Sequence, residues 1–271
     1  LPVDGKGLVD PDALKAAIGS RTALISIMHG NNETGTLQRL ADLTAIAREY
    51  NIPLHTDAVQ TTGKIPIDFA ALGLSMLSFS GHKLYGPKGI GVLVIRKGVK
   101  LTPLIHGGGQ ENGMRSGTEN TASIIGLSLA CRLAAEEMDE EARRLRTLRD
   151  RLQEGLFHAI PHLLLNGSDP DRLYNTLNIS VRFIEGEGML AFLDQKGIRI
   201  SSGSACSTKS LEPSHVLLAL GRDHADAHGS LRISLGRFTQ EQDIDHILKT
   251  LPPIVERLRS MSPFWPPRSE A

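Results

Sequence analysis

The alternation of short apolar runs with helical segments constrains the fold of this 271-residue chain more than any other feature. Apolar runs at 23–28, 52–57 and 75–79 are short and bounded, which is typical of buried strands, and a similar run follows at 90–95. The segment 40–50 carries its apolar residues on one helical face. Strand, helix and strand at this spacing predict a parallel sheet with helices packed on its faces.

The second half of the chain carries another set of alternating elements. A helical pattern over 121–160 ends before Pro161. Beyond it the sequence predicts strands at 176–181, 198–200 and 231–235, helices at 188–195 and 213–220, and a last helix opened by a capping box of Thr239 and Gln242. We therefore expect an α/β fold with two domains: a large one at 1–135 built on a mainly parallel sheet, and a smaller C-terminal α/β domain at 136–271.

The composition limits the partners of the chain. Lys and Arg number 30, and so do Asp and Glu, so the formal net charge is zero and predicts neither nucleic acid nor a membrane surface as a direct partner. The sequence contains no apolar run long enough to span a bilayer and no recognisable signal peptide. Its two cysteines cannot form a disulfide framework, so we expect a cytoplasmic protein.

Two ionisable residues fall at the ends of neighbouring predicted strands. Asp57 ends the run 52–57, and Lys83 follows the run 75–79 within a segment of small and polar residues. This pair suits pyridoxal 5′-phosphate (PLP), because a lysine can bind the cofactor covalently and an acid can keep its pyridine nitrogen protonated. The alternatives are a surface lysine and a turn aspartate. A Walker-type phosphate loop is excluded, because Pro87 occupies the lysine position of that motif.

Three further residues stand out by their surroundings. Cys206 lies among small polar residues, where an exposed thiol favours chemistry over the alternative of an inert, buried cysteine. Arg232 lies in an alternating strand and needs a partner, which could be a substrate carboxylate or a structural acid. Asn32 could be a turn residue or a ligand contact. No CxxC motif or Cys/His cluster occurs, so the sequence predicts no metal site.

Taken together, these motifs resemble those of the cysteine desulfurases of the NifS/IscS type. That family belongs to the class-V aminotransferases, which are PLP-dependent enzymes of fold type I. The resemblance covers residues 1 to about 258, and it is carried by the segments 28–35, 55–60, 78–91, 107–118, 201–207 and 231–238. The family also has a long N-terminal stretch with a phosphate-binding loop and a ring-stacking histidine, so the resemblance implies that the chain is truncated before Leu1 or that the missing part is on another chain.

The resemblance implies a cofactor role for five residues at matching positions. Lys83 would be the Schiff-base lysine, which also acts as a catalytic base. Asp57 would pair with the pyridine nitrogen and Gln60 with the ring hydroxyl. Ser80 and His82 would bind the phosphate, and His82 is also expected to assist catalysis.

The resemblance assigns the remaining roles to four other positions. Asn32 would contact the cofactor ring and the substrate, and Arg232 would hold the substrate carboxylate. Thr118 would bind the phosphate of the partner subunit in a homodimer. Cys206 would be the nucleophile that becomes a persulfide.

The activity implied by the resemblance is conversion of L-cysteine to L-alanine. The persulfide sulfur would pass to an acceptor protein such as an iron–sulfur scaffold, for iron–sulfur clusters or thiolated tRNA. Two alternatives stay open from the sequence: a selenocysteine lyase with the same fold and cofactor, and an inactive fragment that serves as a docking or assembly partner.

Overall fold

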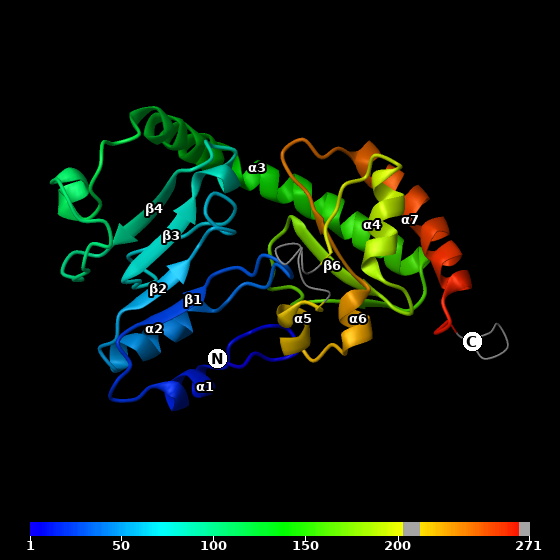
Figure 1. Ribbon diagram of the computed structural model, residues 1–271, viewed down its shortest axis with the longest axis horizontal. Coiled ribbons are helices and arrows are strands. Elements are labelled where there is room, and N and C mark those ends of the chain that lie inside the picture. Colours follow the sequence, from blue (N-terminus) through cyan, green and yellow to red (C-terminus); the bar gives the residue numbers. More distant parts are fainter. Residues whose placement is uncertain (203–211, 266–271) are drawn as a thin grey trace. The chain divides into compact units, whose positions relative to one another are not determined.

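The four-stranded sheet of the computed structural model follows the order of the sequence. Its strands are β1 (Ile25–Met28), β2 (Leu54–Asp57), β3 (Met76–Ser80) and β4 (Gly91–Ile95), in the order β1-β2-β3-β4 (Figure 1). The first three are parallel, as predicted. Strand β4 is antiparallel to β3, because the short connection between them is too brief for a parallel crossover.

Residues 1–202 and 212–265 are the ones that the structure describes, and the chain divides into two units. Unit 1 consists of residues 1–13, 31–38 and 139–271, and unit 2 of residues 14–30 and 39–138. This division assigns two N-terminal segments, 1–13 and 31–38, to the unit that holds the C-terminal half. The expected domains at 1–135 and 136–271 place these two segments in the N-terminal domain, and they stay a prediction.

Helix α2 (Leu40–Glu49) and the four-stranded sheet account for much of unit 2, which also takes in the last residues of helix α1 (Pro11–Ala17). Helix α2 buries Leu40, Leu43 and Ile46 on the face that the sequence pattern predicted. Helix α1 is shorter and buries only Leu14. Each apolar side chain removed from water in this way contributes about 2 kcal/mol to folding.

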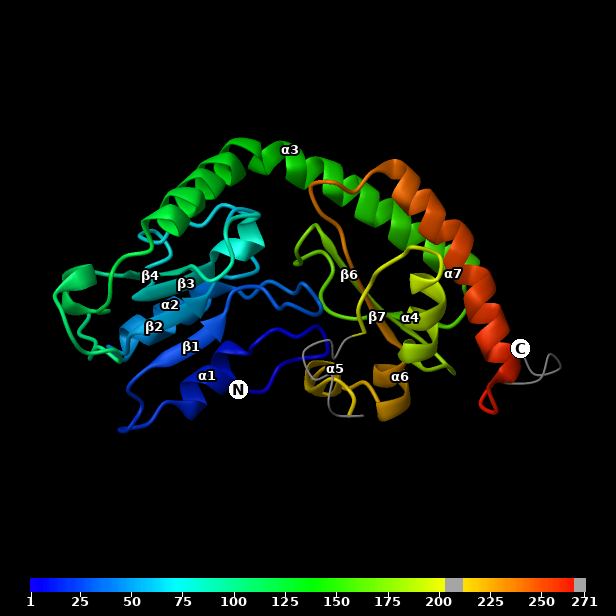
Figure 2. The same cartoon turned by 45° about the horizontal axis from the view of Figure 1, so that its top comes forward.

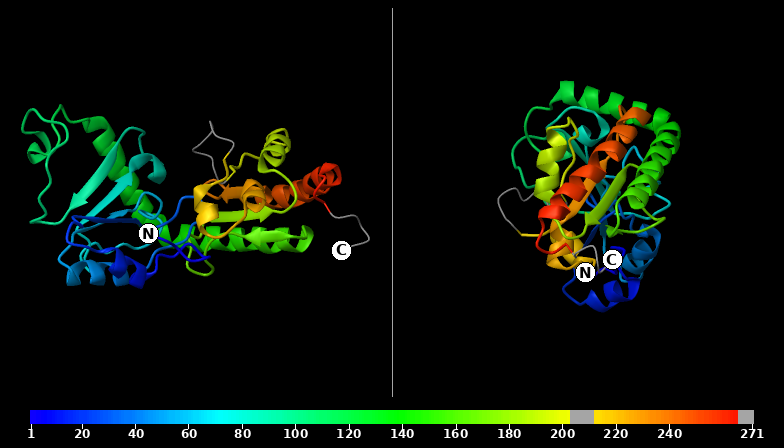
Figure 3. Two further views of the ribbon diagram at one scale, coloured as in Figure 1. Left: turned by 60° about the horizontal axis from the view of Figure 1, so that its bottom comes forward. Right: turned by 90° about the vertical axis from the view of Figure 1, so that its right-hand side faces the viewer.

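Unit 1 is built on an antiparallel sheet of β5 (Leu163–Leu165), β6 (Thr176–Val181) and β7 (Ser230–Ser234). Every residue of β6 is buried. The core joins this sheet to α3 (Thr121–Ala159), α4 (Gly186–Asp194) and α7 (Glu241–Met261). Its fully buried side chains include Leu152, Leu156, Leu177, Ile179, Leu231, Ile244 and Leu251. Helices α4 and α7 run side by side (Figure 2), and α3 is one continuous helix (Figure 3).

The structure corrects the sequence prediction in unit 1 at two places. The predicted strand at 198–200 is not a strand; the chain forms only a single bridge, between Ser201 and Arg232. The capping box of α7 consists of Gln240 and Asp243, not of Thr239 and Gln242. The shift has a clear cause, because the hydroxyl of Thr239 instead accepts the backbone N–H of Gly236.

Several short elements complete the fold. Strand β5 and helix α6 (His224–His228) were not predicted, because three to five residues give too little periodicity. Helix α5 (His215–Ala219) and the 3₁₀ helices η1 (Gly81–Leu84) and η2 (Gln110–Gly113) are equally short. None of the helices within the described ranges is long and apolar enough to cross a membrane.

Candidate active site

The carboxyl ends of β2 and β3 place the predicted cofactor residues at one edge of the sheet. Asp57 is the last residue of β2 and Ser80 the last of β3, and the parallel register pairs Asp57 with Ser78. His82 and Lys83 follow directly in η1, and Gln60 follows β2. We call Asp57, Gln60, Ser80, His82 and Lys83 the strand-end cluster.

The turn that presents Lys83 depends on close backbone packing at two glycines. A Cβ atom on Gly81 would lie 2.9 Å from Cγ2 of Ile90, and one on Gly86 would lie 3.0 Å from the carbonyl oxygen of Gly81. The N–H of Gly86 donates to that same oxygen at 3.0 Å, and Tyr85 adopts a left-handed conformation with φ of 60°. These contacts fix the backbone of η1. The exposed position of the Lys83 side chain therefore follows from the conformation of this turn.

The polar atoms of the cluster are only partly engaged within the described residues. Oδ1 of Asp57 accepts the backbone N–H of Val59 at 2.8 Å, whereas its Oδ2 has no hydrogen-bond partner among them. Oγ of Ser80 lies 2.7 Å from Nδ1 of His82. The edge therefore offers a carboxylate oxygen, a hydroxyl–imidazole pair and a primary amine.

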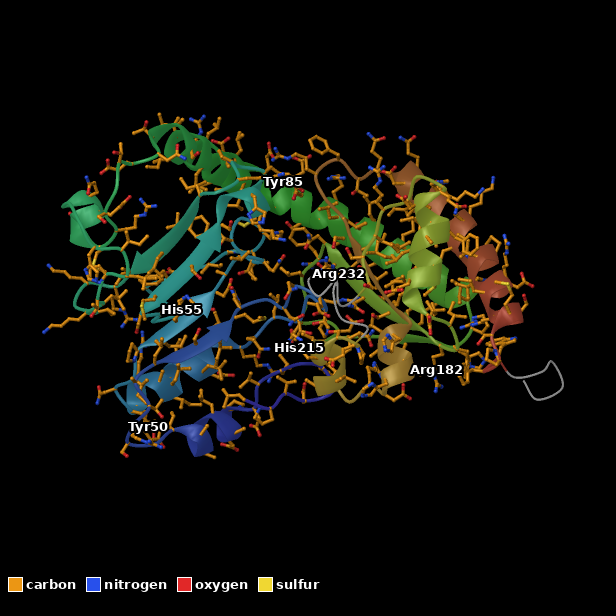
Figure 4. All side chains as sticks on the ribbon, in the orientation of Figure 1. Tyr50, His55, Tyr85, Arg182, His215 and Arg232 are labelled. Carbon is orange, nitrogen blue, oxygen red and sulfur yellow. The ribbon has the colours of Figure 1, made fainter. Side chains whose placement is uncertain are left out.

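Two histidines near this edge were missed by sequence reasoning. His55 on β2 bridges the neighbouring strands, with Nδ1 2.8 Å from Oγ of Ser26 and Nε2 3.1 Å from Oγ of Ser78 (Figure 4). Burial lowers the pKa of His55, and the nearby Asp57 partly opposes that change. The only signal in the sequence was a polar residue inside each predicted strand, Ser26 in β1 and His55 in β2.

His29, directly after β1, is the second of these histidines. Its side chain is only 8% exposed, and burial lowers its pKa to about 4. Its backbone N–H donates to the carbonyl oxygen of Asp57 at 2.8 Å, which joins the ends of β1 and β2. The backbone of His29 therefore supports the strand end that carries Asp57, while its buried Nδ1 has no hydrogen-bond partner among the described residues.

Four predicted residues are not part of the cluster, and for two of them, Thr118 and Cys206, the described part of the chain shows no contact with another predicted residue. Thr118 is exposed in the segment between η2 and α3. Cys206 lies outside the described residues, so the structure adds nothing to the prediction for its thiol.

Asn32 and Arg232 come together in unit 1, although 200 positions separate them in the sequence. The guanidinium Nη1 of Arg232, on β7, donates to the carbonyl oxygen of Asn32 at 3.1 Å. Nε of Arg232 is buried and has no hydrogen-bond partner among the described residues. A buried N–H without a partner is costly, so this atom is suited to an anionic group supplied from outside the described part of the chain.

A buried acid lies beside Arg232. Glu33 is 7% exposed, and its Oε2 accepts a hydrogen bond from the hydroxyl of Ser214 at 2.5 Å. The backbone carbonyl oxygen of Glu33 accepts a hydrogen bond from Nδ2 of Asn178. Asn178, on β6, is the residue that pairs with Arg232 on β7. Burial raises the pKa of Glu33, while Ser214, His215 and Arg232 oppose the rise. We call Glu33, Asn178, Ser214 and Arg232 the turn network.

Glu33 and Ser214 had no predicted role. Glu33 lay inside a segment that carried the family resemblance, and a serine before an apolar run signals a helix cap. Neither signal indicates that the two side chains meet.

The residues present fit PLP. An acceptor oxygen on Asp57 suits a protonated pyridine nitrogen, Lys83 suits an aldehyde, and the Ser80–His82 pair suits a phosphate. The position also agrees with the general rule that ligands of open α/β sheets bind at the carboxyl ends of the strands. Fold and site together define the class as a PLP-dependent α/β enzyme.

The aminotransferase class-V family model matches residues 1–247 of the chain. The chain is 52% identical to the cysteine desulfurase IscS of Dictyoglomus turgidum over 264 residues, 53% identical to that of Methanosarcina thermophila over 266, and 46% identical to the cysteine desulfurase NifS of Azotobacter vinelandii over 265. It belongs to the class-V aminotransferase family, in the NifS/IscS group of PLP-dependent cysteine desulfurases with fold type I.

Solved structures agree with this assignment. A NifS-like protein superimposes with a TM-score of 0.87 at 40% identity, covering 95% of this chain and 68% of the other. The protein SspA in complex with cysteine gives 0.72 at 39% identity, covering 89% and 66%. The alignments with the three relatives include 97–98% of this chain. They include only 66–67% of each relative's own length.

Proposed function

We propose that the protein to which this chain belongs converts L-cysteine to L-alanine and passes the sulfur to an acceptor for the synthesis of iron–sulfur clusters or thiolated tRNA. The observation that carries the proposal is the strand-end cluster at the carboxyl edge of a parallel sheet. Its weight increases because the chain is about half identical to proteins named as cysteine desulfurases.

The strand-end cluster would hold the cofactor. Asp57 would accept the proton of the pyridine nitrogen through Oδ2, and Gln60 would contact the ring hydroxyl. Ser80 and His82 would bind the phosphate, and Nζ of Lys83 would attach the cofactor. PLP, when bound, withdraws electrons from the α-carbon of the amino acid. Nζ of Lys83 would also act as the base that takes the proton from that carbon.

Arg232 would bind the substrate carboxylate, since a guanidinium matches two carboxylate oxygens and its Nε has no other partner among the described residues. Asn32 would help to place the substrate, next to the arginine that its carbonyl oxygen already binds. The bound cysteine in the SspA structure supports cysteine as the substrate.

Cys206 would act as the nucleophile. Its thiolate attacks the sulfur atom of the substrate cysteine, and the bond between that sulfur and the substrate β-carbon breaks. The electron pair of the broken bond stays with the carbon fragment, which gains protons and leaves as L-alanine. The sulfur remains on Cys206 as a persulfide.

The proposal includes a homodimer and a sulfur-acceptor protein such as an iron–sulfur scaffold. The first half of α3 exposes Ile124, Ile125 and Leu129, and Ile125 is 69% exposed. An apolar helix face of this kind suits burial against a second copy, in which Thr118 would bind the phosphate of the partner subunit. A cytoplasmic location is also part of the proposal, supported by the low cysteine content.

The test uses the full-length protein loaded with PLP. Incubation with L-cysteine should release one alanine per sulfur transferred, and mass spectrometry should find the persulfide on Cys206. Cys206→Ser should lose the persulfide while keeping PLP. Cys131→Ser is the matched control, because burial raises the pKa of the Cys131 thiol and disfavours its thiolate. A persulfide on Cys131, activity with selenocysteine alone, or a folded protein that binds no PLP would each refute the proposal.

A further inference from the structure

The turn at residues 31–36 joins segments that lie far apart in the sequence. Ser214 donates to the side chain of Glu33 across 181 positions, Asn178 donates to its carbonyl oxygen across 145, and Arg232 donates to Asn32 across 200. The three donors are the N-cap residue of α5, a residue of β6 and a residue of β7. Glu33 and its neighbour Asn32 therefore receive all three hydrogen bonds.

We propose that Glu33 is a positioning residue for the substrate-carboxylate site, which it orients through Ser214 and through the turn that holds Arg232. The inference rests on the proposed function for the identity of the ligand. It assigns Glu33 no contact with substrate, because its carboxylate is occupied by Ser214 and buried.

The side chain of Ser214 connects Glu33 to the start of α5. Its Oγ accepts the backbone N–H groups of Val216 and Leu217 at 3.2 and 3.4 Å while it donates to Glu33. A hydroxyl that both caps a helix and donates to a carboxylate is held in one orientation. Glu33 therefore fixes the beginning of α5 against the turn 31–36.

The same turn limits where the guanidinium of Arg232 can lie. The backbone of Arg232 pairs with Ser201 in both directions, at 2.6 and 3.2 Å, and its Nη1 is held by Asn32. With backbone and Nη1 fixed, Nε is a buried guanidinium atom that has no partner in the described part of the chain. If the turn shifts, Nη1 loses its acceptor and the guanidinium no longer presents Nε in a fixed direction.

A purely structural acid would explain the burial of Glu33 but not a selective effect on substrate binding. The experiment compares Glu33→Ala and Ser214→Ala, which remove the hydrogen bond, with Glu33→Gln, which keeps an acceptor for the hydroxyl of Ser214. Glu212→Ala is the matched control, because it removes an exposed carboxylate two positions from Ser214.

In the full-length holoenzyme, Glu33→Ala and Ser214→Ala should each raise the KM for L-cysteine about tenfold and change kcat less than about threefold. PLP affinity should stay at the wild-type value. Glu33→Gln should restore KM to within about threefold, and Glu212→Ala should have no effect. A wild-type KM in Glu33→Ala, or equal losses of KM, kcat and PLP affinity in Glu33→Ala and Glu33→Gln, would overturn the proposal.

Two further measurements do not depend on desulfurase activity. Amide hydrogen exchange in the segments 31–36 and 214–219 should accelerate in Glu33→Ala and Ser214→Ala, but not in Glu33→Gln. Binding of L-alanine, followed by the absorbance of the bound cofactor, should weaken in the same two variants. A wild-type protein that releases no sulfur from L-cysteine refutes the proposed function, whereas unchanged exchange and unchanged alanine binding refute the role of Glu33.

Discussion

The strand-end cluster and the turn network achieve their arrangement in different ways. In the cluster, Asp57 and Lys83 follow successive parallel strands, and their side chains are half-buried or exposed. In the turn network, Glu33, Asn178 and Ser214 are buried and come from segments up to 181 positions apart. The cluster needs only a correct sheet edge, whereas the network needs the tertiary fold of unit 1.

This difference has a consequence for mutation. Exposed groups at a sheet edge contribute little to packing, so their loss should affect chemistry more than stability. Buried, hydrogen-bonded groups are coupled to the fold, so their loss should affect both. The predictions below test this contrast, beginning with the largest expected effect.

Lys83→Ala in the full-length protein should reduce desulfurase activity by about 10³-fold or more, because both the attachment point and the base are removed. The absorbance of covalently attached PLP and its fixation by borohydride should disappear. The free energy of unfolding of the apoprotein should not change, since Lys83 is exposed. Lys88→Ala, another exposed lysine five positions later, is the control; loss of the absorbance there instead would transfer the assignment to Lys88.

Asp57→Asn should slow the reaction about a hundredfold, because a neutral amide cannot hold the proton of the pyridine nitrogen. The amide oxygen can still accept the N–H of Val59, so the strand end should keep its structure. Single-turnover kinetics and a urea titration measure the two effects. Asp68→Asn is the control and should behave as wild type, because the Asp68 carboxylate accepts the local backbone N–H groups of Ala70 and Ala71. A near-normal rate in Asp57→Asn would remove this residue from the mechanism.

Arg232→Ala should raise the KM for L-cysteine about thirtyfold and leave PLP affinity unchanged, because the guanidinium binds the substrate and not the cofactor. Arg232→Lys should recover only part of the loss, since an ammonium group cannot match both carboxylate oxygens. Arg199→Ala removes an exposed guanidinium and serves as control. Equal losses of PLP and substrate affinity would mark Arg232 as structural and weaken the contrast between the two regions.

A substitution of His29 tests whether a buried group beside the strand-end cluster affects the stability of the protein. The pKa of His29 is lowered from 6.5 to about 4, so below pH 6.5 the unfolded chain binds a proton that the folded chain does not. Stability should therefore fall as the pH decreases, by about 1.4 kcal/mol between pH 7.5 and pH 5.5. Urea unfolding should show a smaller pH dependence in His29→Asn but not in the exposed control His106→Asn. An unchanged pH dependence in His29→Asn would exclude His29 as its source.

The prediction from sequence succeeded where spacing along the chain decides the structure. Three parallel strands, two of which end in polar residues, follow from local pattern, so Asp57, Ser80 and Lys83 could be placed at one edge before the fold was known. His55 escaped notice because its two serine partners lie on different strands. The capping box of α7 was misplaced by one residue because the hydroxyl of Thr239 serves another backbone N–H.

By itself, the sequence determined the α/β class, the parallel order of β1 to β3 and the identity of the residues at the strand ends, since each depends on period and chain order. Only the tertiary structure decided that Glu33 meets Ser214 and that Nη1 of Arg232 is held by Asn32 while Nε is not. These contacts join segments separated by 181 and 200 positions. Local propensity carries no information about such pairs, because burial and hydrogen-bond satisfaction select them only after the sheet and helices have packed.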